Sequence, residues 1–411
     1  MSHNFTEDQV HGYLYQAGLE KLIADCPQIN DAAISVEEDF QLWRIIKQKT
    51  FAKIARIHNS VRYGNFIASK LKLPTDKTTP MELDLLGTHE DGLFILELKV
   101  NKPAERNAFS ELLAYSNYIA EIFASSGRRD ITNVLVANLD AKITRHAFLY
   151  DLLVADRNTI VYKPSFLGTE INTLRLDLYL PSDEDFKSFT NELLSHDTMS
   201  CVAVSFHDVD GWFDSKEDNS SVNDYTRDHL EKLSNYAAQL MEADGLHGFC
   251  FVRKRWAEIP SYYSNTLFVC SINPFNLVNN ERAESITNQL SEENKAAFFE
   301  CATLGFDGRL IQIAKKAVTE CLIHNQDSEI ELPLWAGVVN SMIEVVFTHN
   351  FGFNPTGLLR ESYIAHLENI YRHNEDHPED EIDVSYLKAN EITNWLRAWE
   401  FMTACGFKET D

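Results

Sequence analysis

The chain has 411 residues, of which 44% are hydrophobic, and carries a formal net charge of −25 at pH 7. This length and apolar content suffice for two or three packed domains and argue against wholesale disorder. No run of about 18 apolar residues is present, so no membrane span is predicted. A chain this acidic repels polyanions on average, so nucleic acid can bind only where cations are concentrated.

The N-terminal residues lack the basic and then apolar segments of a secretory signal. The seven cysteines are scattered and form no C-x-x-C pair. We therefore expect a cytoplasmic protein with reduced cysteines in its core, rather than a disulfide framework or a zinc cage.

Positive charge is concentrated in residues 44–80, which hold nine basic residues and one acid, Asp76. The apolar residues between Leu42 and Ile57 recur at helical spacing, so we expect a helix with a basic outer face. Such a face either contacts phosphates or is merely solvated, and the sequence leaves both open. The basic residues are Arg44, Lys47, Lys49, Lys53, Arg56, Arg62, Lys70, Lys72 and Lys77.

After Pro80 the apolar pattern changes to two short runs with a polar, Gly-bounded connection, which predicts a β-hairpin over 81–86 and 93–100. Helices and strands alternate downstream, so the fold class is α/β, an α/β sandwich around a mixed sheet. The expected elements are a helix over 103–125, a strand over 131–139, a helix over 144–154, a strand over 159–162 and an edge strand over 174–180.

A second region begins near Asp183. Strands are expected over 201–206, 248–252 and 266–272, with an amphipathic helix over 225–244, and from Glu281 onward the pattern is mainly helical. We therefore expect a first domain over 1–182, an α/β domain of unknown role over 183–280, and a mostly helical region over 281–411 that is either separate from or continuous with the preceding domain.

Charged residues interrupt the second strand of the hairpin. Glu97 and Lys99 are two residues apart and share one face of an otherwise apolar strand, where burial is costly without a purpose. Asp84 lies on the partner strand, and the hairpin would bring its carboxylate beside Glu97. Two hard oxygen ligands suit Mg²⁺, with Mn²⁺ as a substitute, so Asp84 and Glu97 are predicted metal ligands. The alternative is a cross-strand salt-bridge cluster on a solvated sheet face.

These residues resemble the PD-(D/E)xK nuclease superfamily. The resemblance consists of Pro80 to Asp84, a short hairpin, the run Glu97-Leu98-Lys99, and a helix that carries Glu111 and Tyr115 four residues apart. The helix spacing is similar to the Q-x-x-x-Y motif of several families, with Glu in place of Gln. The resemblance covers roughly residues 40–165, under a third of the chain.

The resemblance implies a domain of restriction-endonuclease type that hydrolyses phosphodiester bonds with Mg²⁺. Lys99 would orient the attacking water or stabilise developing charge, Glu111 would add an outer ligand, and Tyr115 would position the helix or a phosphate. Many members carry an acid on the first core helix. The helix expected here over 61–70 has none, and Glu20 or Glu38 could substitute only from farther away, so a non-cleaving site stays open.

We therefore expect a nuclease, with DNA favoured over RNA as its substrate and strandedness left open, of the kind found in restriction, repair or anti-phage defence. The alternative is a non-catalytic nucleic-acid-binding or scaffold protein with a degenerate nuclease core. The C-terminal region would bind a protein partner or a regulatory ligand, no membrane is expected, and a homodimer is left open. The residues expected to contact nucleic acid are Lys47, Lys53, Arg56, Arg62, Lys70, Lys102 and Arg106.

Overall fold

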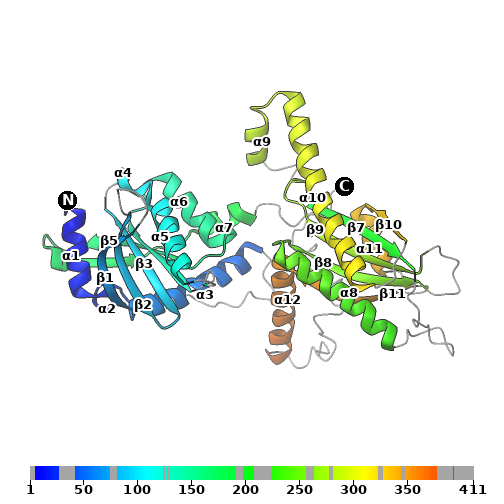
Figure 1. Cartoon of the computed structure of the whole chain (residues 1–411), viewed down its shortest axis with the longest axis horizontal. Coiled ribbons are helices and arrows are strands. Elements are labelled where there is room, and N and C mark those ends of the chain that lie inside the picture. The colour runs from blue at the N-terminus through cyan, green and yellow to red at the C-terminus, as the bar shows by residue number, and fades with distance from the viewer. Residues whose placement is uncertain are drawn as a thin grey trace. The chain divides into compact units, whose positions relative to one another are not determined.

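The computed structural model divides the chain into two compact units (Figure 1), Met1–Asp31 with Ile46–Phe189, and Ala32–Ile45 with Thr190–Asp411. Among the described residues no helix is both long enough and apolar enough to cross a membrane. The structure describes residues 5–26, 42–74, 81–100, 102–123, 126, 130–190, 198–207, 224–255, 263–276, 281–322, 327–343, 348–376 and 392.

The described strands of the first unit form one mixed sheet in the order β1-β2-β3-β4-β5-β6. The first three strands are antiparallel, β3, β4 and β5 run parallel, and the edge strand β6 is antiparallel to β5. The predicted hairpin and α/β architecture around a mixed sheet are therefore confirmed. The strands are β1 (Asn65–Leu73), β2 (Met81–His89), β3 (Gly92–Lys99), β4 (Ile131–Ala137), β5 (Thr159–Phe166) and β6 (Leu174–Leu178).

Helices flank this sheet, and α5 packs on β3 and β4 while α6 packs on α5. The helix expected over 103–125 is divided into α4 and α5, and the helix expected over 144–154 ends in a π-helical turn, η1. The helical elements are α1 (Glu7–Ala17), α2 (Leu19–Leu22), α3 (Leu42–Arg62), α4 (Lys102–Glu105), α5 (Ala108–Ile122), α6 (Lys142–Leu149), η1 (Tyr150–Val154), η2 (Ile171–Thr173) and α7 (Asp183–Thr190).

The prediction of a helix over 61–70 is wrong, because α3 ends at Arg62 and most of this segment belongs to strand β1. Gly64 separates the two elements, and a Cβ there would stand 2.8 Å from the Phe94 ring and 2.9 Å from the Thr88 carbonyl oxygen. In the first half of β1 exposure alternates residue by residue, which is the period of a strand. The basic residues of 44–80 are consequently divided between a helix and a strand.

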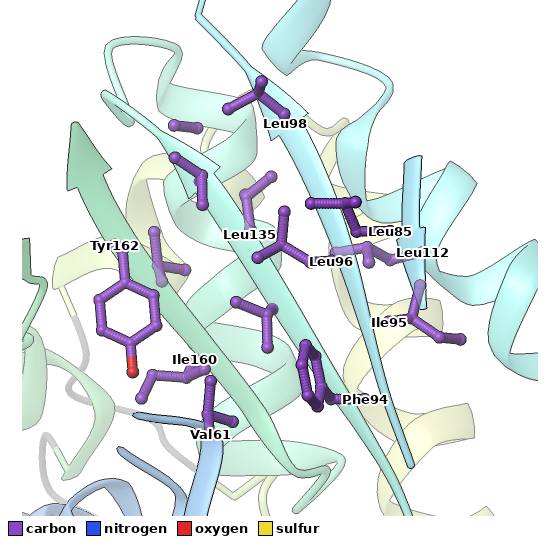
Figure 2. Packing of buried hydrophobic residues seen from close by; sticks show 14 of the residues in the cluster. Val61, Leu85, Phe94, Ile95, Leu96, Leu98, Leu112, Leu135, Ile160 and Tyr162 are labelled. Carbon is purple, nitrogen blue, oxygen red and sulfur yellow. The ribbon is translucent and has the colours of Figure 1, made fainter. Parts of the chain in front are cut away.

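The core of the first unit lies between the sheet and its helices. Figure 2 shows part of it, including Leu96, Leu135 and Ile160 of the three parallel strands, each at most 1% exposed. Phe94 and Leu96 alternate with Ile95 and Glu97 along β3, so one face of the strand is wholly apolar and the other carries the charged residues. Burying a side chain such as leucine contributes about 1.5–3 kcal/mol.

The described strands of the second unit form an antiparallel sheet in the order β10-β7-β9-β8-β11. The described part of the segment from Glu281 onward is mostly helical, as predicted, but it also supplies the two edge strands of this sheet. The elements are β7 (Met199–Phe206), α8 (Asp224–Ala243), β8 (Gly248–Arg255), β9 (Asn265–Ile272), α9 (Glu281–Thr287), α10 (Glu292–Cys321), β10 (Ser328–Glu331), α11 (Trp335–Ile343), β11 (Thr348–Thr356) and α12 (Gly357–Asp376).

Each face of the second sheet has its own helices. α8 and α10 share an aliphatic core with β7, β8 and β9. Aromatic rings pack on the opposite face. The ring centroid of Phe249 lies 5.8 Å from that of Trp335 of α11 and 5.4 Å from that of Phe353. Phe353 in turn packs on Tyr363 of α12. Cys201, Cys250 and Cys270 are buried as free thiols, whereas Cys301 is exposed, so the expectation of core cysteines does not extend to every one described.

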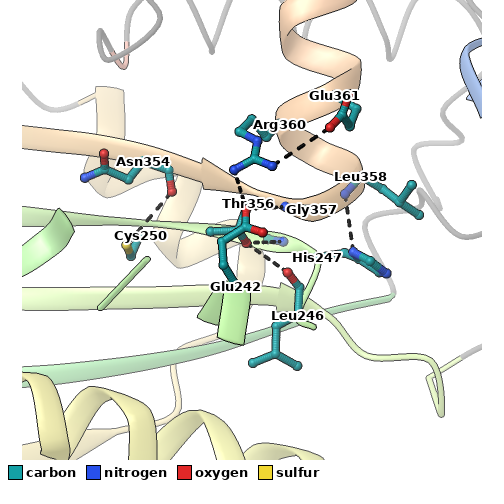
Figure 3. A network of polar contacts seen from close by, with 11 residues as sticks. Glu242, Leu246, His247, Cys250, Asn354, Thr356, Gly357, Leu358, Arg360 and Glu361 are labelled. Carbon is teal, nitrogen blue, oxygen red and sulfur yellow. Dashed lines mark hydrogen bonds and ion pairs between the residues drawn. The ribbon is translucent and has the colours of Figure 1, made fainter. Parts of the chain in front are cut away.

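The first turn of α12 is held by side chains from its neighbours (Figure 3). The Gly357 N–H donates to Glu242 Oε1 at 3.0 Å, and the Leu358 N–H donates to His247 Nδ1 at 3.3 Å. Arg360 pairs with Glu242 at 2.7 Å. Gly357 has a φ of +54°, and a Cβ there would meet the His247 ring at 2.2 Å. These contacts satisfy free N–H groups at a helix start and need no ligand.

Candidate active site

Asp84 of β2 and Glu97 of β3 come together where the hairpin ladder ends. Its last pair is Leu85 with Leu96, so the next step along both strands places Asp84 opposite Glu97. Opposite residues of antiparallel strands point to the same face of the sheet. Beyond this pair the Leu98 N–H donates to Asp84 Oδ2 at 2.9 Å, so the carboxylate takes the place of a ladder partner.

Lys99 joins the strand carboxylate to helix α5. Its Nζ lies 2.5 Å from Glu97 Oε1 and 2.8 Å from Glu111 Oε2. The Glu97 side chain is 3% exposed and that of Lys99 12%, while Glu111 is 35% exposed. The pair is therefore buried, and the alternative of a salt-bridge cluster on a solvated face does not describe it.

Burial raises the pKa of Glu97 to about 9, and the nearby Asp84 carboxylate adds to the rise. Burial alone would lower the pKa of Lys99, but Glu97 and Glu111 hold it above its ordinary value. For Glu111 the upward effect of burial is outweighed by hydrogen bonds with Lys99 and Glu97, which lower its pKa. At neutral pH the cluster therefore holds a protonated Glu97, an ionised Glu111 and a charged Lys99.

Tyr115 lies one helical turn beyond Glu111 on α5 and is buried. Its hydroxyl donates to the Glu82 carbonyl oxygen at 2.8 Å, which fastens α5 to β2. Burial raises its pKa to about 12, and the Glu97 and Glu111 carboxylates contribute to the rise. The phenol therefore stays protonated and positions the helix.

Helix α1 supplies two site residues that the sequence did not single out. Glu7 accepts a hydrogen bond from the Val100 backbone, and its pKa is raised by burial, opposed by Lys99 and reinforced by Asp84. One turn later, buried His11 donates from Nε2 to the Asp84 carbonyl oxygen at 3.1 Å. An acid on the first helix is thus present, contrary to the sequence expectation, whereas Glu20 has no contact with the cluster and Glu38 lies outside the described residues.

The local signal for this helix is its N-terminal capping box. Thr6 accepts from the Gln9 N–H, and the Gln9 side chain accepts from the Thr6 N–H, which fixes where α1 begins. The spacing of Glu7 and His11 puts both on one face of the helix. Their arrival at β2 and β3 depends on how α1 docks on the sheet, which no local pattern encodes.

Within the described ranges, no three His, Cys, Asp or Glu side chains are so placed, as they stand, that they could hold a metal ion. The donors present are nevertheless carboxylate oxygens, the kind that a hard divalent ion prefers. Glu97 Oε2 is buried with no hydrogen-bond partner among the described residues. Glu7, Glu97 and Glu111 each interact with Lys99, and the Asp84 carboxylate raises the pKa of Glu7 and of Glu97. Among these residues carboxyl groups outnumber the lysine, and a hard divalent ion would balance the excess.

The basic residues expected to contact nucleic acid are mostly paired with acids of the same unit. Lys102 belongs to α4, but its side chain lies outside the described part of the structure, and Arg106 is exposed. A phosphate would have to compete with each existing partner. The pairs are Lys47–Asp183, Lys53–Asp156, Arg56–Asp91, Arg62–Asp25 and Lys70–Asp8.

Comparison of the chain with family models, with curated proteins and with solved structures found no match.

Proposed function

We propose that this chain is a Mg²⁺-dependent nuclease that hydrolyses phosphodiester bonds, with DNA as its expected substrate and Mn²⁺ as a substitute metal. The observation that carries the proposal is the Glu97 carboxyl group. It is buried at the end of an apolar strand and has one oxygen without a described hydrogen-bond partner. It pairs with Lys99, and the Asp84 carboxylate lies near enough to raise its pKa. Burying such a group is costly, and a bound cation would offset that cost.

Asp84 and Glu97 are the proposed metal ligands, with Glu7 and Glu111 as further oxygen donors. When bound, the ion would neutralise the phosphate and lower the pKa of a coordinated water. Ligation needs the Glu97 carboxylate, so loading the site removes the proton that this group carries at neutral pH.

Lys99 is proposed to stabilise the negative charge that develops on the phosphate oxygens. Its raised pKa keeps the ammonium charged at every pH near neutrality, so it does not act as a general base. Glu97 and Glu111 hold its Nζ on two sides, which fixes the charge before substrate arrives. Preorganised charge of this kind supplies a large part of the barrier reduction in such reactions.

The test compares substitutions of two acids on the same strand, β2. Asp84→Asn should remove Mg²⁺-dependent cleavage of labelled single- and double-stranded DNA and RNA, whereas Glu82→Gln should leave it intact. Glu82 is exposed, and its hydrogen bond with Tyr115 uses the backbone carbonyl, which the substitution retains. Equal loss in both variants would show that the acidity of β2, rather than a metal ligand, matters.

The second candidate is a non-catalytic nucleic-acid-binding or scaffold protein with a degenerate nuclease core. Lys99 favours it, because the ammonium already forms ion pairs with Glu97 and Glu111 without any metal. On this proposal the wild-type chain would bind nucleic acid and cleave none. A role in restriction, repair or anti-phage defence, a partner or regulatory ligand for the second unit, homodimer formation and a cytoplasmic location remain predictions from the sequence.

A further inference from the structure

Lys70 has an unusual backbone for a residue within a strand. Its φ is +48°, in the left-handed region that non-glycine residues rarely occupy. Strained conformations of this kind persist only where the surroundings impose them, and they cluster at functional sites. Lys70 is also exposed, so burial of its own side chain does not explain the conformation.

The register of β1 places this residue in line with the carboxylates. The pairs Ser69–Leu85 and Leu71–Leu83 enclose Lys70 and Asp84, so these two stand opposite each other. Asp84 in turn stands opposite Glu97 on β3. Neighbouring strands are about 4.8 Å apart, so Lys70 lies about one strand spacing from Asp84 and about two from Glu97.

Lys70 forms an ion pair with Asp8 of helix α1, the helix that also carries Glu7. Lys70 Nζ lies 2.7 Å from Asp8 Oδ1, and Asp8 is the neighbour of Glu7 in α1. The side chains are 48% and 81% exposed. The hydrogen bond between them lowers the pKa of Asp8 and raises that of Lys70, so both stay charged. An ion pair this exposed is weak, and another anion can replace one partner.

We propose that Lys70 binds a phosphate of the nucleic acid next to the scissile bond, and that Asp8 occupies Lys70 until the substrate displaces it. This inference rests on the proposed nuclease function. It gives Lys70, which the sequence already suggests as a nucleic-acid contact, a place beside the carboxylates and a competing anion, Asp8. Asp8 also lines an open groove of about 620 Å³ beside α1. The described residues that line this groove include the acid Glu170 and no basic residue. Lys70, at 2.7 Å from Asp8, is a cation that a phosphate arriving beside Asp8 could reach.

Binding of fluorescein-labelled DNA, single-stranded and duplex, would be measured by anisotropy over a series of salt concentrations with Ca²⁺ as the metal. Asp8→Asn should bind several-fold more tightly, because the competing carboxylate is gone. Lys70→Ala should bind more weakly, with a salt slope shallower by about 0.9 on duplex DNA or about 0.7 on single strands. Lys70→Arg should retain the wild-type slope.

The matched control is Glu184→Gln. Glu184 and Lys187 of α7 form an ion pair with side-chain exposures of 79% and 48%, close to those of Asp8 and Lys70, and α7 contributes nothing to the carboxylate cluster. Both substitutions change the net charge equally. A gain for Asp8→Asn that is absent in Glu184→Gln and lost in the Asp8→Asn/Lys70→Ala double variant supports the proposal.

The proposal is overturned if Asp8→Asn binds as the wild type does, if its gain persists without Lys70, or if no DNA binds at all. Cleavage in Mg²⁺ is measured separately on the wild-type chain. Absent cleavage together with the expected binding pattern contradicts the nuclease function and leaves Lys70 as a phosphate-binding residue.

Discussion

Glu97 is the residue whose protonation decides what the candidate site can bind. As a neutral acid it adds no negative charge to the carboxylates near Lys99. As a carboxylate it adds a buried negative charge beside Asp84, which is unfavourable unless a cation is present. If the proposed metal binds, the same group links folding stability, pH and metal affinity, and each link can be measured.

The first prediction concerns stability against pH. The pKa of Glu97 is about 9 in the folded chain against an ordinary value of 4.5, so between these values the folded state binds more protons than the unfolded state. The free energy of unfolding should therefore fall as pH rises, by at most ~1.4 kcal/mol per pH unit. Glu97→Gln should flatten this fall in urea unfolding without metal. An equally steep fall in the variant would contradict the assignment.

The second prediction concerns the metal. Binding of Mg²⁺ should release a proton below pH 9 and grow tighter as pH rises toward that value, because ligation needs the Glu97 carboxylate. Calorimetry in two buffers with different ionisation enthalpies measures the number of protons released. Binding that releases none, or that is independent of pH, would exclude Glu97 as a ligand. Glu97→Gln serves as the control: it should bind Mg²⁺ more weakly, and the binding that is left should release no proton from this position.

At the scale of elements, α1 fastens the two diverging strands of the hairpin. His11 bonds to the Asp84 carbonyl on β2, and Glu7 accepts from Val100 just after β3. Tyr115 fastens α5 to β2 in a similar way. The strand carboxylates thus depend on two helices for their positions. In metal sites, too, the orientation of the ligands commonly depends on hydrogen bonds from surrounding residues.

The third prediction follows from this arrangement. Glu7→Gln should weaken Mg²⁺ affinity and cleavage about 10-fold or more, while the melting temperature changes little because the helix cap at Thr6 and Gln9 is retained. Glu20→Gln is the matched control, since Glu20 is an exposed acid on the following helix, α2. A similar loss in both variants would mean that overall charge, and not the position of Glu7, is responsible.

The hairpin and the positions of Asp84, Glu97 and Lys99 could be predicted because strand period and a polar connection are local signals. The segment around Lys70 could not, since its apolar residues fit either period and its pairing with β2 is a long-range contact. Glu7 was missed for the same reason. It is close to Asp84 only after α1 docks, although 77 residues separate the two in the sequence.

At the scale of the whole molecule, the chain has a net charge of −25, and several of its basic side chains are paired with nearby acids. Lys53 pairs with Asp156 and Arg56 with Asp91, so these two basic residues of α3 already have anionic partners. A phosphate contact there must break an ion pair before it gains one. Local concentration of cations in the sequence therefore overstates the positive field that nucleic acid would meet.

The fourth prediction tests this pairing. For the double variant Lys53→Ala/Arg56→Ala, the slope of log affinity for duplex DNA against log salt concentration should become less steep by less than about 1.8. A change of roughly 1.8 is expected when two free cations each lose a phosphate contact. The measurement is a salt titration of binding for the double variant and the wild type. A full reduction of about 1.8 would show that both side chains leave their carboxylates and bind phosphates in the complex.

The central claim is that the Lys99 cluster hydrolyses nucleic acid with a divalent metal, and single-turnover cleavage by Lys99→Ala and wild-type chains tests it most directly. The wild type should cleave in Mg²⁺ or Mn²⁺ and stop in EDTA, whereas Lys99→Ala should lose turnover and keep its fold and its DNA affinity. Lys99→Met, which preserves side-chain length, controls for packing and should be equally inactive. Undiminished turnover without Lys99, or no cleavage of any DNA or RNA by the wild type, would contradict the claim.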